Sequence, residues 1–431
     1  MDINPLINYQ VTMPLRVILF CACTMLISPA LSQKALSLED RIYEPQIKTV
    51  QCYPNQPTEG NSLLPAATRM ETQNLLLEFD DLREQHSNYS IRLIHCNFDW
   101  TKSILMDLDF MHDYNEFAIN DYSFSLNTFV PYVHYRIEIP PVKIPGNYVA
   151  IIYRDGNRQD LILSKRIVVF DSKLDLKTDN QISGLGNIRS TNQALNFMIN
   201  YGRTEIINPL GSIHVVIRQN QRWDNAKIDV KPSFVREDIS QLEYRSFDMD
   251  NTFQAGNEFR FVDFRSLNYP GQNTLRLDKS RKPFELFVNV DGPRTYQSYS
   301  QYADLSGNFY PANADYPQEP WISANYLQVN FSLQSPPVKG DLFVIGAFNG
   351  WERNEGNKMK YDQGMYTKKI LMKQGFYNYE YWVNSAEADG NQVEGNHFET
   401  ENIYEVLVYY RPFQPNADLL VGYFVIPVNA R

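Results

Sequence analysis

The chain has 431 residues, 43% of them hydrophobic, so it is long enough for about two to four domains with buried cores and lacks the composition of a disordered protein. Its formal net charge of −10, without any long basic block, argues against binding to nucleic acid and against electrostatic attachment to an anionic lipid surface. The 28 tyrosines and 25 phenylalanines favour β structure, because aromatic side chains fit pleated, half-covered surfaces.

Residues 1–32 have the pattern of a secretory signal peptide, which we expect to be cleaved. Arg16 supplies the positive charge, and the apolar run 17–27 that follows is too short to span a bilayer. Ala30-Leu31-Ser32 offers a small-x-small cleavage pattern, and Met13 is a candidate for the true initiator. No later apolar run reaches membrane-spanning length, so we expect an exported protein without direct membrane insertion.

Two of the four cysteines lie in this signal, which leaves Cys52 and Cys96 in the mature chain. An oxidising compartment allows a disulfide between them, but sequence does not show whether their Cα atoms come within bonding range. The alternative is that Cys96 is a small buried hydrophobic residue.

Short apolar runs separated by turn signals fill the first predicted domain, residues 33–172. The clearest is 132–139, where apolar and polar residues alternate as in a half-buried strand. In the run 89–98 the alternation changes phase, which indicates either a bulge or a strand covered on both faces. Gly146-Asn147-Tyr148, at the start of another apolar run, is typical of the tyrosine corner of immunoglobulin-like domains.

The remaining chain predicts two more domains of the same kind. We expect a second immunoglobulin-like or fibronectin-like sandwich at 173–300, a linker or arm at 301–321 that is poor in aliphatic residues, and a third sandwich at 322–431. The predicted fold class is therefore all-β, with three tandem β-sandwich domains behind the signal peptide.

Four motifs in the first domain carry a family resemblance: RLIHCNFDW at 92–100, NDYSFSLNT at 120–128, YVHYRIEIP at 132–140 and PGNYV at 145–149. In this order they resemble the conserved region of the type IX secretion system plug proteins of Bacteroidetes, and a looser likeness extends over about 40–300. The resemblance implies a periplasmic protein, without enzymatic activity, that sits against the periplasmic mouth of the very large outer-membrane translocon barrel and seals it. We assign structural roles to the motif residues His95, Cys96, Asp99, Trp100 and Tyr148.

The third domain resembles the early-set sandwich of glycogen-binding modules over about 335–385. Those modules hold sugar against flat aromatic faces, and Trp351 matches one such position. The second stacking tryptophan has no counterpart in 386–396, so packing at a strand end is the favoured role of Trp351.

The sequence lacks the motifs of common catalytic sites. There is no G-x-S-x-G, no H-E-x-x-H, no phosphate-binding G-x-x-x-x-G-K, and no C-x-x-C after the signal. None of the six histidines has metal-ligand spacing within one element, although His95 and His134 fall on strands that we expect to be neighbours. We therefore predict no catalytic residue, no cofactor and no metal site, and leave open a calcium ion between loops.

These observations favour a periplasmic plug, associated peripherally with the outer membrane through its partner, the translocon barrel of the type IX secretion system. The sequence leaves two candidates for the sealing surface, namely the tip of the first domain at 101–127 and the arm at 295–320. The alternative function is that of an exported carbohydrate-binding accessory protein that uses its third domain.

Overall fold

The computed structural model describes residues 34–58, 60–178, 188–246, 252–387 and 390–430, together with Met1. The chain separates into two units, residues 1–33 and residues 34–431, and everything below concerns the second. The predicted signal peptide, with Met13, lies outside the described residues. Among the described residues, no helix is long and apolar enough to cross a membrane.

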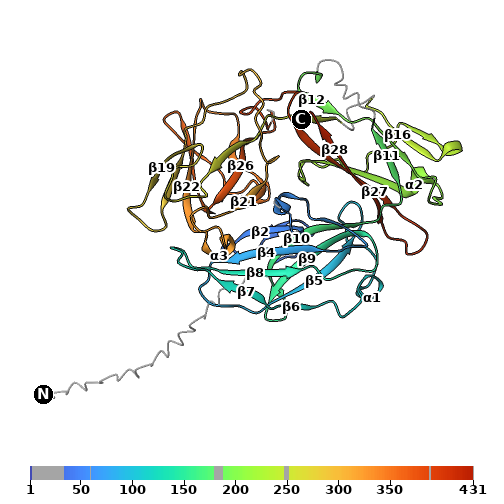
Figure 1. Ribbon diagram of the computed structural model, residues 1–431, viewed down its shortest axis with the longest axis horizontal. Coiled ribbons are helices and arrows are strands. Elements are labelled where there is room, and N and C mark those ends of the chain that lie inside the picture. The colour runs from blue at the N-terminus through green and yellow to red at the C-terminus, as the bar shows by residue number, and fades with distance from the viewer. Residues whose placement is uncertain (2–33, 59, 179–187, 247–251, 388–389, 431) are drawn as a thin grey trace. The chain divides into compact units, whose positions relative to one another are not determined.

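The first sandwich consists of two facing sheets (Figure 1). One sheet has the order β1-β10-β9-β5-β6, with β3 added parallel to β10, and the other has the order β2-β4-β8-β7. Its strands are β1 (Arg41–Ile42), β2 (Ile47–Pro54), β3 (Ala67–Arg69), β4 (Leu75–Asp81), β5 (Tyr89–Cys96), β6 (Phe117–Ile119), β7 (Asp121–Phe124), β8 (Val133–Glu138), β9 (Gly146–Arg154) and β10 (Asn157–Phe170). Two short helical turns, η1 (Asn61–Leu63) and α1 (Asp107–Phe110), connect them.

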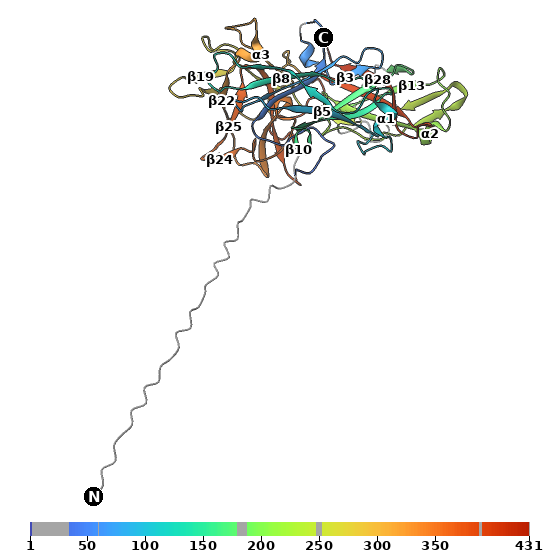
Figure 2. The same cartoon turned by 90° about the horizontal axis from the view of Figure 1, so that it is seen from below.

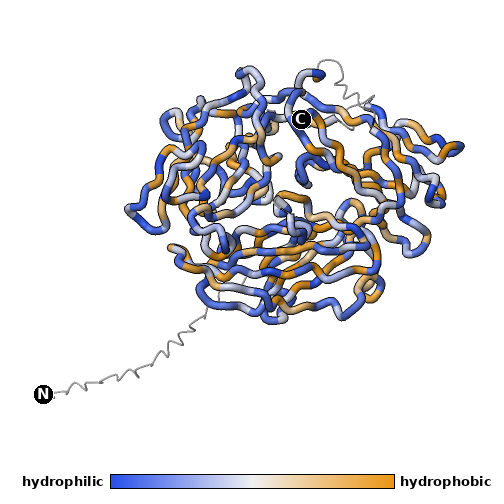
Figure 3. The backbone as a smooth tube through the Cα atoms, viewed as in Figure 1, coloured by the Kyte–Doolittle hydropathy of each residue, from blue (hydrophilic) through white to orange (hydrophobic). Residues whose placement is uncertain are grey.

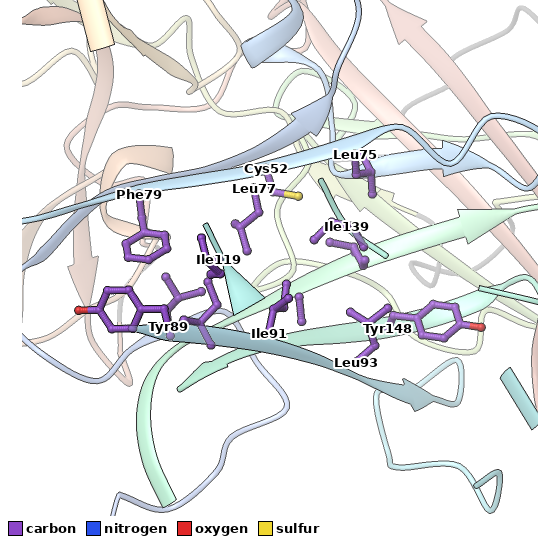
Figure 4. Close-up of a cluster of buried hydrophobic side chains, with 14 of the residues drawn as sticks. Cys52, Leu75, Leu77, Phe79, Tyr89, Ile91, Leu93, Ile119, Ile139 and Tyr148 are labelled. Carbon is purple, nitrogen blue, oxygen red and sulfur yellow. The ribbon is translucent and has the colours of Figure 1, made fainter. Parts of the chain in front are cut away.

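Strand β5 has both faces buried, which explains the phase change in its sequence. It pairs with β9 without a register shift from Tyr89 to Cys96, so the strand contains no bulge against β9. Ile91 and Leu93 point into the core between the two sheets (Figure 4), whereas Ile94 and Cys96 belong to a second cluster on the opposite face. Since that second cluster also contains side chains of the second sandwich, β5 lies inside the molecule and not at its surface.

The second sandwich is built from segments that are far apart in the chain. Its sheets have the orders β11-β13-β16-β15, β12-β17 and β14-β27-β28. The strands are β11 (Asp175–Thr178), β12 (Asn192–Ala194), β13 (Phe197–Asn200), β14 (Ile213–Gln219), β15 (Phe234–Arg236), β16 (Gln241–Tyr244), β17 (Thr252–Gln254), β27 (Asn402–Tyr410) and β28 (Leu419–Val428), with the helical turns α2 (Pro209–Ser212) and η3 (Glu237–Ile239).

The third sandwich occupies the chain between β17 and β27. One sheet is built around β26, which pairs with β18, β21 and β23, and the other has the order β19-β20-β22-β25-β24. Its elements are β18 (Arg260–Asp263), β19 (Thr274–Asp278), β20 (Glu285–Val288), β21 (Phe309–Pro311), α3 (Pro320–Ser323), β22 (Tyr326–Gln334), β23 (Asp341–Ile345), η4 (Ala347–Asn349), β24 (Lys360–Asp362), β25 (Met365–Lys373) and β26 (Gly375–Asn384).

This pairing differs from the predicted boundaries at 300 and 322. Strands β18 to β20, which we placed in the second domain, pair with strands of the third sandwich. The last two strands, β27 and β28, pair with β14 of the second. The expected linker 301–321 contains β21, which is hydrogen-bonded to β26. We therefore propose a division in which the third sandwich is inserted into the second.

Many of the hydrophobic stretches of the chain coincide with β-strands of the packed sheets, as the hydropathy colouring shows (Figure 3). In the view turned by 90°, α1 lies beside β5 (Figure 2).

The side chain of Tyr148 donates a hydrogen bond to the carbonyl of Ile144 over 2.7 Å, and Tyr377 donates to the carbonyl of Lys373 over 2.6 Å. Both tyrosines stand two residues after the glycine that begins a core strand, so the first and third sandwiches contain the same corner.

Candidate functional site

The motif residues at the end of β5 lie where the first sandwich meets the second. Trp100 is buried, with its backbone in the left-handed region at φ 65°, and packs edge-on against Trp223 at 4.8 Å between ring centroids. The guanidinium of Arg166 lies 4.5 Å from the Trp100 ring centroid. Because Trp223 follows β14, these contacts join the two sandwiches.

The turn after β5 continues the same junction. Asp99 Oδ1 accepts hydrogen bonds from the backbone N–H and the hydroxyl of Thr101, at 3.0 and 2.6 Å, and so closes the turn. The neighbouring Phe98 stacks on His214 of β14 with 4.1 Å between centroids. Its N–H donates to the carboxylate of Asp418, in the turn before β28, over 3.1 Å. The geometry of these residues is that of a structural junction.

His95 is a buried histidine without a hydrogen bond. Its ring meets Tyr148 edge-on at 5.0 Å, and a Cβ atom on Gly146 would lie 2.4 Å from its Nε2. Neither ring nitrogen has a hydrogen-bond partner, although the nearby carbonyl of Pro145 and the charge of Asp418 favour protonation. Burial outweighs them and lowers the pKa of His95 to about 4, so the ring is neutral at physiological pH.

Both cysteines of the mature chain are free and buried. Cys52 faces the core between the two sheets of the first sandwich (Figure 4), and Cys96 lies in the cluster on the other face of β5. The sheet that contains β5 therefore separates them, and the disulfide that the sequence left open is not formed. Burial raises the pKa of each thiol to about 12, so both are poor nucleophiles.

We expected His95 and His134 to lie on neighbouring strands, and this prediction is wrong. His95 lies on β5, between β9 and β6 of one sheet, whereas His134 lies on β8, between β4 and β7 of the other sheet. Alternation alone does not specify the sheet to which a strand belongs. Among the described residues no group of three or more His, Cys, Asp or Glu is arranged to hold a metal ion.

His134 belongs instead to a buried ionic cluster that joins the first sandwich to the third. Asp80 of β4 lies at its centre, with one carboxylate oxygen 2.7 Å from His134 Nδ1. The other oxygen accepts hydrogen bonds from Lys373 Nζ over 2.7 Å and from the Tyr326 hydroxyl over 2.6 Å. Asp80 is fully buried, and the side chain of Lys373 is 1% exposed. Lys373 also donates to the carbonyl of Trp321 over 2.6 Å.

Opposite charges act against the effect of burial in this cluster. Burial by itself raises the pKa of Asp80, but Lys373 and His134 outweigh it and hold the pKa below its usual range. Burial likewise tends to lower the pKa of His134, yet its contacts with the carboxylates of Asp80 and Glu78 raise it above the usual range. For Lys373 burial prevails, and the pKa is lowered. Sequence reasoning missed this cluster, because Asp80 and Lys373 are 293 residues apart.

Trp351 is packed inside the molecule and not presented to solvent. Its side chain is 9% exposed, and the guanidinium of Arg222 lies over its ring, 4.0 Å from the centroid. Phe259 meets the ring edge-on at 5.7 Å. Arg222 is held there by Glu380 at 2.8 Å and Asp224 at 2.9 Å. A sugar would have to displace an ion-paired arginine to stack on this ring.

The first sandwich exposes a set of apolar side chains beside α1. Ile104, Met106, Leu108 and Tyr114 are 72%, 74%, 82% and 75% exposed, respectively. We call these four residues the apolar tip. Four large exposed apolar side chains within one short segment are unusual for a free surface and are typical of an interaction site. The tip falls in the segment 101–127 that we named as one of two candidate sealing surfaces.

The fold and these sites define an all-β protein of packed sandwiches in which buried ion pairs and aromatic contacts join the sandwiches. Comparison with known proteins identifies the first of them: residues 47–171 match the family described as "Type 9 secretion system plug protein 1st domain". The match covers the first sandwich, where the four motifs lie, and it supports a role related to type IX secretion.

Two further comparisons add to this. A crystal structure of a hypothetical protein from Parabacteroides merdae ATCC 43184 is similar, with a TM-score of 0.84 and 26% sequence identity. The similarity covers 91% of this chain and 100% of that chain, so it includes all three sandwiches. No curated protein matches the sequence.

Proposed function

We propose that this protein is a plug without enzymatic activity that docks on the translocon barrel of the type IX secretion system and seals it from the periplasm. The family match over residues 47–171 is the observation that carries the proposal. The match supports a location at the cell envelope. In this proposal the protein is periplasmic and is associated peripherally with the outer membrane through its partner.

Two physical features support a plug. First, a stopper has to resist deformation, and the buried contacts between Asp80 and Lys373 and between Trp100 and Trp223 join the first sandwich to both others. Second, it needs a contact surface, and the apolar tip offers side chains that lose water when they are covered.

Affinity capture from the organism's own envelope tests the proposal. The tagged mature protein, solubilised together with its membrane partners, should recover one very large outer-membrane barrel, identified by mass spectrometry. Capture of envelope proteins that never include a type IX component would contradict docking. The carbohydrate-binding alternative has no observation in its favour, since Arg222 covers the ring of Trp351.

A further inference from the structure

A cavity of about 330 Å³ lies at the base of the apolar tip. It is bounded on one side by β5 and on the other by the segment 102–110. The pairing of β5 with β6 ends at Ile91, and beyond it the segment is tied back by the N–H of Ser103, which donates to the carbonyl of His95. The cavity therefore occupies the place where β5 has lost its strand neighbour.

Arg92, His95 and Lys102 line this cavity. The His95 ring is neutral, Lys102 is exposed, and none of the three forms an ion pair with a carboxylate that the structure describes. Neither ring nitrogen of His95 has a hydrogen-bond partner, and the Nε atom of Arg92 also lacks one. His95 is 1% exposed. Lys102 forms no ion pair within 4.0 Å with any carboxylate that the structure describes. Buried donors without acceptors are rare, because each costs the free energy of its lost hydration.

The carboxylates nearby are engaged by other groups or lie beyond ion-pair distance. Asp418, whose charge acts on His95, is bonded to the guanidinium of Arg411. Glu116, whose pKa is lowered by Arg158 and to a smaller extent by Arg92, is ion-paired with Arg158 at 3.0 Å. Asp107 also lines the cavity but is exposed and lies beyond ion-pair distance of both cations. The cavity thus retains an excess of hydrogen-bond donors and positive charge.

The other wall of the cavity is apolar. Ile104, Leu105, Met106 and Phe110 line it, and the first and third of these belong to the apolar tip. A ligand that satisfies both walls carries an anionic group next to an apolar one. A planar carboxylate suits the cationic donors of Arg92 and Lys102, because each of its oxygens accepts hydrogen bonds from more than one direction.

We propose that this cavity binds the carboxylate of a peptide segment, either an Asp or Glu side chain or a C-terminus, whose neighbouring apolar side chain packs on the apolar tip. That the peptide belongs to a docking partner in the envelope rests on the proposed function. That the ligand is an apolar carboxylate rests on the lining of the cavity alone.

A titration with a small probe tests the chemistry. The full mature protein, labelled with ¹⁵N in its histidine rings, is titrated with 3-phenylpropionate and, separately, with the uncharged 3-phenylpropionamide. The His95 ring signal, assigned by its loss in His95→Gln, should shift and saturate with the carboxylate and stay unchanged with the amide. Equal shifts with both probes, or none with either, would overturn the proposal.

Two variants and a matched control locate the site. Arg92→Gln and Lys102→Gln should each weaken binding of the carboxylate about tenfold or more, the usual effect of losing one charge-assisted hydrogen bond. Lys143→Gln is the control, because Lys143 is exposed and donates to the carbonyl of Leu108, in the same region, without lining the cavity. Equal weakening by the control would show a general effect of charge and overturn the site. Unchanged melting temperatures establish that the variants are folded.

Envelope capture then separates this inference from the proposed function. If the wild type recovers the barrel and Arg92→Gln/Lys102→Gln does not, the cavity is part of the docking contact. If the wild type and the double variant recover the barrel equally, the proposed plug function is supported and the assignment of the cavity to docking is wrong. If the wild type recovers no barrel, the proposed function fails, and the probe titration decides on the carboxylate site by itself.

Discussion

The ion pair between Asp80 and Lys373 should be the most costly single contact to break between the first and third sandwiches. Lys373→Met keeps the volume of the aliphatic stem but removes the ammonium group, which lies 2.7 Å from Asp80 Oδ2 and 2.6 Å from the carbonyl of Trp321. Both side chains of the pair are at most 1% exposed, so water cannot replace the lost charge. Removing one partner of such a pair costs about 3–5 kcal/mol.

We expect a value near the lower end, about 3 kcal/mol, because Asp80 keeps two other donors, His134 at 2.7 Å and Tyr326 at 2.6 Å. Urea denaturation followed by tryptophan fluorescence measures the effect as a shift of the unfolding midpoint. If the sandwiches unfold in separate steps, the shift should appear in the first step, where the sandwiches come apart.

Lys369→Met is the matched control. Lys369 lies on the same strand, β25, and pairs with Glu285 at 2.9 Å, but its side chain is 46% exposed. An exposed pair of this kind contributes about 0–1 kcal/mol. The double variant Asp80→Asn/Lys373→Met should be less destabilised than the sum of the two single variants, since it leaves no unpaired buried charge. A cost for Lys373→Met no larger than that of the control would refute the role given to burial.

Three further predictions concern single residues. The pKa of His134 is raised in the folded state, so protonation of this ring stabilises the fold. The stabilisation should be complete below pH 6.5, the ordinary pKa of histidine, and should be lost as the pH rises through the folded-state pKa of His134. His134→Gln should therefore flatten this part of the stability–pH curve. Gly146→Ala should cost about 1–3 kcal/mol in thermal unfolding, because the new Cβ atom would collide with His95, whereas Gly292→Ala, with open space around it, should not. Tyr148→Phe should cost about 1 kcal/mol, because it leaves a carbonyl without its donor; a stability equal to the wild type would show that the corner bond is not needed.

The fold class could be predicted from the sequence, because the alternation that marks a β-strand is a relation between side chains only two residues apart. The alternation of 132–139 became β8, and the phase change of 89–98 reflects the two buried faces of β5. The glycine and tyrosine at 146 and 148 indicated a corner, and the corner bond is present. In each case the signal can be read within a single strand, even where the residues that bury the strand come from elsewhere in the chain.

The order of the sandwiches could not be predicted in the same way. Strand β27 is as apolar as the strands of the third sandwich, and nothing in its own residues states that its partner is β14, almost two hundred residues earlier. The same holds for Asp80, whose pairing with Lys373 depends on how two sandwiches meet. His95 was named from its motif, but only the structure shows that it is buried without a partner beside a cavity.

The central claim is that the protein seals a translocon, and the permeability of the envelope tests it most directly. In a strain that lacks this protein, uptake of a hydrophilic fluorescent probe too large for general porins should rise. The rise should disappear when the translocon barrel is deleted as well, and when the wild-type protein is restored. Uptake that is unchanged on loss of the protein, or that rises equally in the absence of the barrel, would contradict a plug.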